Sequence, residues 1–177
     1  MVILYLSPFS PANSSDYGFL TSEELAGEKG DKYKITIYVV KESKSKSVFA
    51  TVVPRKGMLT EQAVATEFQL ECIKEVGYQN SPIQLRSDQE PAIKAVIESI
   101  VASRSAQTIV TPASKGDSQS NGAAEVTVQR IAGQVKTLRL SIESNLSGLL
   151  PITHPVFNWM IRHAGYVICR FPVSYTH

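Results

Sequence analysis

The sequence predicts one α/β domain in which a mixed β-sheet carries helices on its faces. The chain has 177 residues, enough to bury a core of its own, and 43% of them are hydrophobic, an ordinary share for a globular protein. Strand-like segments come first along the chain and then alternate with helical segments. That order favours a sheet flanked by helices.

Three strands are expected in the first third of the chain. Residues 32–40 (KYKITIYVV) and 47–54 (SVFATVVP) are rich in β-branched and aromatic side chains. The charged, serine-rich run at 41–47 separates them, so the pair predicts a hairpin. Residues 16–20 (DYGFL) are short and alternating, and predict a partner strand.

Helices and strands alternate in the rest of the chain. Residues 60–78 place apolar side chains at helical spacing, and Gly77 is the expected stop. Residues 89–104 predict a helix with Pro91 in its first turn, where proline is tolerated. Further strands are expected at 82–88 and 107–113, a polar loop at 114–122, and helices at about 122–145 and at 154–171.

Composition excludes several classes of protein. A net charge of +2 is too small to identify a nucleic-acid partner and does not oppose one. No apolar run approaches the roughly 20 residues of a membrane span, and the opening MVILYLSPFSPANSS has no basic region, so we expect an intracellular, unsecreted protein without a membrane partner. Cys72 and Cys169 are expected to be free buried thiols. The three histidines have no cysteine pair at zinc-site spacing, so no zinc is expected.

Two acids stand where helices are expected to begin. Asp88 ends the strand at 82–88, and functional side chains gather at the carboxyl edge of α/β sheets. Alternatively, Asp88 caps the helix that starts at Gln89, and the two roles are compatible. Glu125 falls in the first turn of the helix at about 122–145, where a carboxylate also suits the positive helix end.

The periodicity of that last helix separates two stripes. At about 100° per residue, the apolar stripe must face the core, and a neighbouring stripe starts with an acid and ends with two cations. This second stripe fits either a solvated surface or a face that binds a metal at one end and phosphates further along. The apolar stripe is Val128, Ile131, Val135, Leu138 and Ile142, and the second is Glu125, Gln129, Ala132, Lys136 and Arg139.

Asp16, near the start of the first strand, is a third acid, with a turn aspartate as the alternative reading. Three carboxylates could hold two divalent cations about 4 Å apart, which activate a water or hydroxyl and stabilise the leaving oxygen of a phosphodiester. Hard cations such as Mg²⁺ prefer carboxylate oxygens. The chemistry of the residues alone leaves both readings open.

The order of these acids, Asp16, Asp88 and Glu125, with 36 residues between the last two, resembles the D,D-35-E pattern of integrase catalytic cores from retroviruses and LTR retrotransposons. The segments LRSDQEPAI, SQSNGAAE and VQRIAGQVKTLR resemble those around and after the second and third acids of that family. The resemblance spans about residues 14–172. It leaves 1–13 as a poorly defined segment and 173–177 as a truncated tail.

The resemblance implies an RNase H-like fold, with a five-stranded mixed sheet flanked by helices. It also implies phosphoryl transfer that depends on Mg²⁺ or Mn²⁺, in which water trims a DNA 3′ end and the freed hydroxyl attacks target DNA. The expected partners are DNA and further copies of the chain, and the place of action is the nucleus. By the same resemblance, Asp16, Asp88 and Glu125 are the catalytic metal ligands, Asn121 and Gly122 shape the turn that aims Glu125, and Asn121, Gln129 and Lys136 contact nucleic acid.

The chain departs from the family in two respects. SPANSS precedes Asp16 where the family has apolar strand residues, which leaves Asp31 as a fallback first acid. The zinc-binding N-terminal module and the basic C-terminal module of the family do not occur in this sequence. Two alternatives follow: a remnant that keeps the fold and binds nucleic acid or a partner without strand transfer, or another RNase H-like nuclease. The second would need a fourth acid, for which Asp117 is the candidate.

Overall fold

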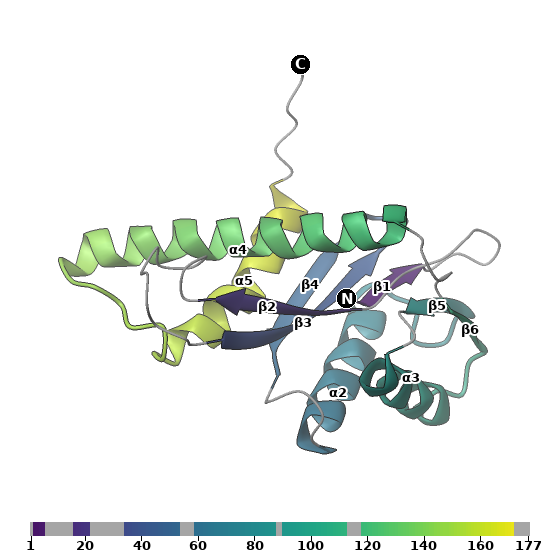
Figure 1. Ribbon diagram of the computed structural model, residues 1–177. Helices are drawn as coiled ribbons and strands as arrows, with labels where there is room; N and C mark the ends of the chain where they lie inside the picture. Colours follow the sequence, from purple (N-terminus) through teal and green to yellow (C-terminus); the bar gives the residue numbers. More distant parts are fainter. Residues whose placement is uncertain are drawn as a thin grey trace.

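The computed structural model describes residues 2–5, 16–21, 34–53, 59–87, 90–112 and 118–171. Within these ranges, the side chains of 2–5, 16–19, 21, 34, 59–61, 87, 112 and 118–125 are not described. The chain has an α/β fold in which two pairs of helices cover the opposite faces of a mixed sheet (Figure 1). In the described part of the chain, no helix is both long and apolar enough to cross a membrane.

The order of elements along the chain is the predicted one, with one strand added at the beginning. The strands are β1 (Val2–Tyr5), β2 (Asp16–Thr21), β3 (Lys34–Glu42), β4 (Val48–Val52), β5 (Ile83–Ser87) and β6 (Thr108–Pro112). The helices are α2 (Leu59–Glu75), α3 (Pro91–Ser103), α4 (Ser118–Leu146) and α5 (Val156–Arg170).

Strand β3 is the centre of the sheet. Its one edge pairs antiparallel with β4, and its other edge pairs first with β2 and then with β1. Strands β1 and β2 therefore lie end to end along β3 and point in opposite directions. Strand β1 then joins this half of the sheet to β5, which pairs in parallel with β6.

The predicted number of five strands is wrong, because the described sheet has six. The additional strand is β1, from the segment at 1–13 that the sequence pattern left undefined. Its apolar residues VILY take the place between β3 and β5. A mixed sheet flanked by helices is confirmed.

Alternation along β3 builds a core on each face of the sheet, as expected for a strand covered on both sides. Ile37 and Val39 face α4 and α5, and their cluster includes Ile131, Val135 and Phe157. Tyr38 and Val40 face α2 and α3, in the cluster that contains Ile73, Leu85 and Ile97. The expected core stripe of α4 is confirmed: Ile131 and Val135 are buried, and Val128, Leu138 and Ile142 pack against the same cluster.

The ends of α2 and α3 follow from their sequences. Gly77 has φ +83° just after α2, a backbone conformation that glycine adopts without strain, so the predicted stop is confirmed. Helix α3 begins at Pro91, and its N-cap is Glu90, whose side chain makes no capping hydrogen bond. The alternative role of Asp88 as the cap is therefore wrong, because the helix starts beyond Gln89.

Candidate functional site

The carboxyl end of β5 is the first part of the candidate site. Strand β5 ends at Ser87 beside the end of the parallel strand β6, so two strand ends meet at this edge. Arg86 is partly buried and pairs with Ile3 of β1 on one side and Thr111 of β6 on the other. The predicted ligand Asp88 follows this strand directly and lies outside the described residues.

Strand β2 starts at the same end of the sheet. Its first residue is Asp16, whose backbone pairs with Val39, and the next position along β3, Val40, pairs with Val2 of β1. Continuing the pairing of β1 with β5 by one residue sets Val2 opposite Ser87. The backbone of Asp16 thus begins its strand close to the point where β5 ends. The strand predicted at 16–20 is confirmed.

Helix α4 carries the third acid and starts earlier than predicted. It begins at Ser118, so Glu125 lies in its second turn and the reading of a first-turn carboxylate is wrong. Asn121 and Gly122 have helical backbones, and the turn expected at these two residues is absent. In Figure 1 the N-terminal half of α4 lies on the side of β1 and β5, and the helix then runs along β2.

Of the elements that carry the predicted metal ligands, β2 begins close to the end of β5, and α4 contacts β2. The side chains of Asp16 and Glu125 lie outside the described part, as do Asp88 and the alternative acids Asp31 and Asp117. Among the described residues, no group of three His, Cys, Asp or Glu side chains could hold a metal ion.

The second stripe of α4 is partly exposed and partly buried. Gln129 and Lys136 are exposed, as contacts to a ligand require, and the side chain of Asn121 is not described. Arg139 is different: it is only 4% exposed, and its Nε donates a hydrogen bond of 2.8 Å to Glu143. Its assignment to a ligand-facing stripe is wrong, because it lies close enough to the core stripe to be covered.

A basic cluster flanks α4 on the side of the β3–β4 hairpin. It consists of Lys41 from β3, Lys46 from the hairpin and Arg130 from α4. Burial, and then the charges of Lys46 and Arg130, lower the pKa of Lys41 below its ordinary value of 10.5. The sequence pattern missed this cluster, because KESKSKS at 41–47 indicated only a charged break between strands. Nothing in the sequence indicates that Arg130, almost 90 residues later, lies near residues 41–47.

The described part of the chain also contains a cavity of about 400 Å³ away from the acid-bearing elements. It lies between α2, β4 and α5, and its lining includes Phe68, Cys72, Cys169 and Arg162. Both cysteines are free, as predicted, although Cys169 is only partly buried. The thiol of Cys169 accepts a hydrogen bond from the backbone N–H of Val48 at 2.9 Å, which gives it a structural role.

Comparison with known proteins identifies the fold. No protein-family model and no curated protein matches the chain. Among solved structures, the chain is similar to the catalytic core domain of BIV integrase, with a TM-score of 0.52 and 17% sequence identity. The similarity covers 91% of this chain and 84% of that one. The chain therefore has a fold similar to that of this catalytic core domain.

Proposed function

We propose that residues 14–172 form a DNA-processing and DNA-joining catalytic core of the integrase kind, acting in the nucleus as a multimer. The observation that supports this proposal is an integrase-like fold in which the strand that begins with Asp16 starts close to the end of β5. Asp16 begins β2 close to the end of β5, Asp88 comes directly after Ser87 in the sequence, and Glu125 lies in the second turn of α4. The motifs around Asp88 and Glu125 support the same reading.

Asp16, Asp88 and Glu125 would hold Mg²⁺ or Mn²⁺. Three carboxylates are the donor set that such hard cations prefer, so the chemistry of the residues fits the group. The metal ions would activate the attacking oxygen and stabilise the leaving one. Asn121, Gln129 and Lys136 would position the DNA backbone along α4, and the exposure of Gln129 and Lys136 supports this.

The direct test is DNA nicking and joining. The protein, with any flanking domains of its natural polypeptide, is incubated with an oligonucleotide duplex and Mg²⁺ or Mn²⁺. We expect Glu125→Gln to abolish the products, because an amide lacks the charge that holds a cation. Glu98→Gln, the same chemical change at an exposed position of α3, is the control and should leave activity unchanged.

The two alternatives give different results in this assay. Activity that persists in the Glu125→Gln protein would remove Glu125 from the metal site. DNA binding without any product from the natural protein would favour the remnant that binds nucleic acid. Hydrolysis without joining would favour another nuclease of this fold.

A further inference from the structure

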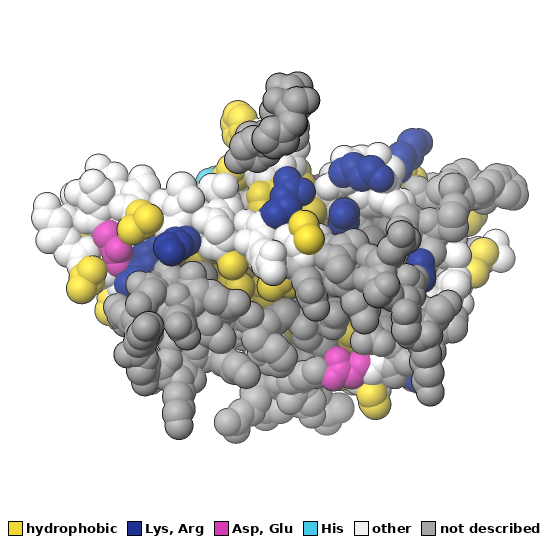
Figure 2. Space-filling view, turned by 45° about the horizontal axis from the view of Figure 1, so that its top comes forward, with side chains coloured by type: hydrophobic (Ala, Val, Ile, Leu, Met, Phe, Trp, Pro, Cys, Tyr) yellow, Lys and Arg dark blue, Asp and Glu magenta, His cyan; other side chains and the backbone are white. Residues whose placement is uncertain are grey.

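The basic cluster of Lys41, Lys46 and Arg130 brings together three cations from segments far apart in the sequence. Lys41 is half-buried, and the other two are exposed. None of the three has an ion-pair partner in the described part of the chain. In Figure 2, dark-blue side chains gather on the right-hand part of the upper edge, with no magenta side chain visible among them. The charges of Lys46 and Arg130 both act on Lys41, and an anion bound beside Lys41 would offset this repulsion.

Glu42, the acid next to Lys41 in the sequence, binds backbone groups of the hairpin turn. Glu42 follows Lys41 on β3, and alternation along a strand directs its side chain to the opposite face. Its buried carboxylate accepts hydrogen bonds from the backbone N–H groups of Lys44, at 2.7 Å, and of Ser45. Glu42 therefore stabilises the hairpin turn and does not neutralise the charge of Lys41.

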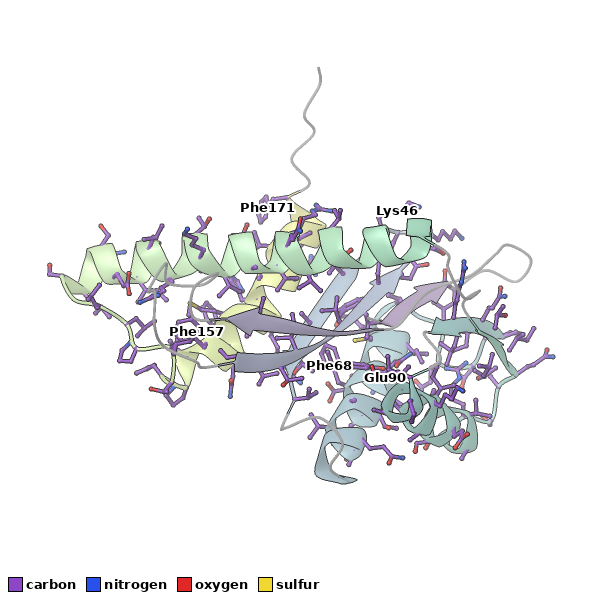
Figure 3. The ribbon with its side chains drawn as sticks, viewed as in Figure 1. Lys46, Phe68, Glu90, Phe157 and Phe171 are labelled. Carbon is purple, nitrogen blue, oxygen red and sulfur yellow. The ribbon has the colours of Figure 1, made fainter. Side chains whose placement is uncertain are left out.

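The hairpin fixes the position of Lys46. Its φ is +62°, in the left-handed region that glycine adopts more easily than lysine. Hydrogen bonds close the turn around it, from the N–H of Glu42 to the carbonyl of Ser47 at 2.8 Å and between the hydroxyls of Ser45 and Ser47 at 2.7 Å. These contacts hold the backbone of Lys46 in place at the end of the hairpin turn. Figure 3 shows Lys46 beside the N-terminal end of α4.

The cluster lies near the candidate site, on the side of α4 that faces away from the stripe of Gln129 and Lys136. Lys41 is two residues along β3 from Val39, the partner of Asp16, which is about 7 Å. Arg130 is five residues beyond Glu125, about 7.5 Å along the axis of α4, and about 140° around it. Duplex DNA carries one negative charge for about every 1.7 Å of its length, so a duplex at the acids would bring further phosphates to this flank.

We propose that Lys41, Lys46 and Arg130 bind the phosphodiester backbone of duplex DNA on the hairpin side of α4, across the helix from the stripe of Gln129 and Lys136. The identity of the ligand as DNA rests on the proposed function. The binding itself needs neither the metal nor the three acids. The cluster positions DNA and carries no sequence specificity, because it contacts phosphates only.

Binding in EDTA tests this inference separately from catalysis. The whole protein is titrated into a fluorescein-labelled DNA duplex, and anisotropy gives Kd at several salt concentrations. The paired change Lys46→Gln and Arg130→Gln is compared with Lys74→Gln and Lys94→Gln, two exposed cations of α2 and α3 on the other face. Both pairs remove the same charge. We expect the cluster pair to weaken binding about tenfold and to lower the slope of log Kd against log salt by about 2, and the control pair to change neither.

Lys41 provides a second readout that separates binding from folding. The fold already disfavours its charge, so Lys41→Gln should keep or raise the unfolding midpoint while weakening DNA binding severalfold. Equal effects of the two charge pairs on Kd would overturn the proposal, as would unchanged binding in all cluster variants. If the natural protein binds DNA in this way but gives no nicked or joined product, the result counts against the catalytic proposal alone.

Discussion

At the scale of single residues, Glu143 shows how a charged pair is held at the edge of the core. Its Oε1 accepts hydrogen bonds from Arg139, at 2.8 Å, and from the backbone N–H of Leu150, at 2.7 Å. The N–H of Leu150, followed by Arg139, lowers the pKa of this carboxyl below its ordinary value of 4.5. The carboxylate thereby ties the end of α4 to the loop that leads into α5.

The lowered pKa of Glu143 predicts a pH-dependent contribution to stability. A carboxyl with a lower pKa in the folded state stabilises the fold above its unfolded value, and this is lost as pH falls through the folded value. We expect Glu143→Gln to lower the unfolding midpoint at pH 7 and to lose less stability than the natural protein between pH 5 and pH 3. Urea denaturation at these pH values measures it, with Glu67→Gln, an exposed change in α2, as the control. An equal pH response of the natural protein and the Glu143→Gln protein would contradict the assignment.

The helical periodicity predicted the exposed and buried sides of α4 and misplaced Arg139. Residue 139 lies about 60° from the centre of the core stripe, near the boundary between the two stripes. Its partner Glu143 is also held by the backbone amide of Leu150, which lies beyond the helix. A helical projection contains no such contact, so the sequence pattern could not decide this side chain.

At the scale of elements, the contact of α5 with β4 depends on one glycine. A Cβ at Gly165 would lie 2.8 Å from the carbonyl oxygen of Val48 and 3.4 Å from the nitrogen of Ala50. These are backbone atoms of a paired strand, so they cannot move aside cheaply. The absence of a side chain therefore lets α5 lie directly on β4, over the core that also contains Phe157.

We expect Gly165→Ala to lower the free energy of unfolding by about 1–3 kcal/mol, because the added methyl group must push two elements apart. Gly133→Ala is the matched control. Gly133 is exposed within α4, a Cβ there meets no heavy atom within 4 Å, and alanine should raise stability by about 0.5–1 kcal/mol. Urea denaturation of both variants gives the comparison. Two changes of the same sign would show that α5 and β4 are not in such close contact.

The start of α4 marks a limit of local sequence patterns. The segment SQSNG contains serine, asparagine and glycine, residues that favour turns, and it predicted a loop before residue 122. The backbone is helical from Ser118, so tertiary context overrides weak local preferences here. The apolar stripe that follows was predicted correctly, because it repeats over several turns.

At the scale of the whole molecule, the sequence predicted the helices, five strands and their order, and it missed how the sheet is completed. The family pattern requires apolar strand residues before Asp16, and SPANSS does not supply them. The neighbouring position on β3 is taken by Val2 of β1, which comes from another segment and runs in the opposite direction. A four-residue strand that pairs with residues about 40 and 80 positions away leaves no local signal of its partners.

The candidate site spans the same distant parts of the chain, so a bound metal should stabilise the whole fold. A ligand that binds only the native state stabilises it by about 2.7 kcal/mol at a hundred times its Kd, which corresponds to roughly 5–10 °C in the unfolding midpoint. We expect Mn²⁺ to raise the midpoint of the natural protein relative to EDTA. Asp88→Asn should remove most of this rise, and Glu98→Gln, an exposed change in α3, should retain it. Because this measurement needs no DNA, an unchanged midpoint with Mn²⁺, or an equal rise in the Asp88→Asn protein, would argue against Asp88 as a metal ligand whatever the activity assay shows.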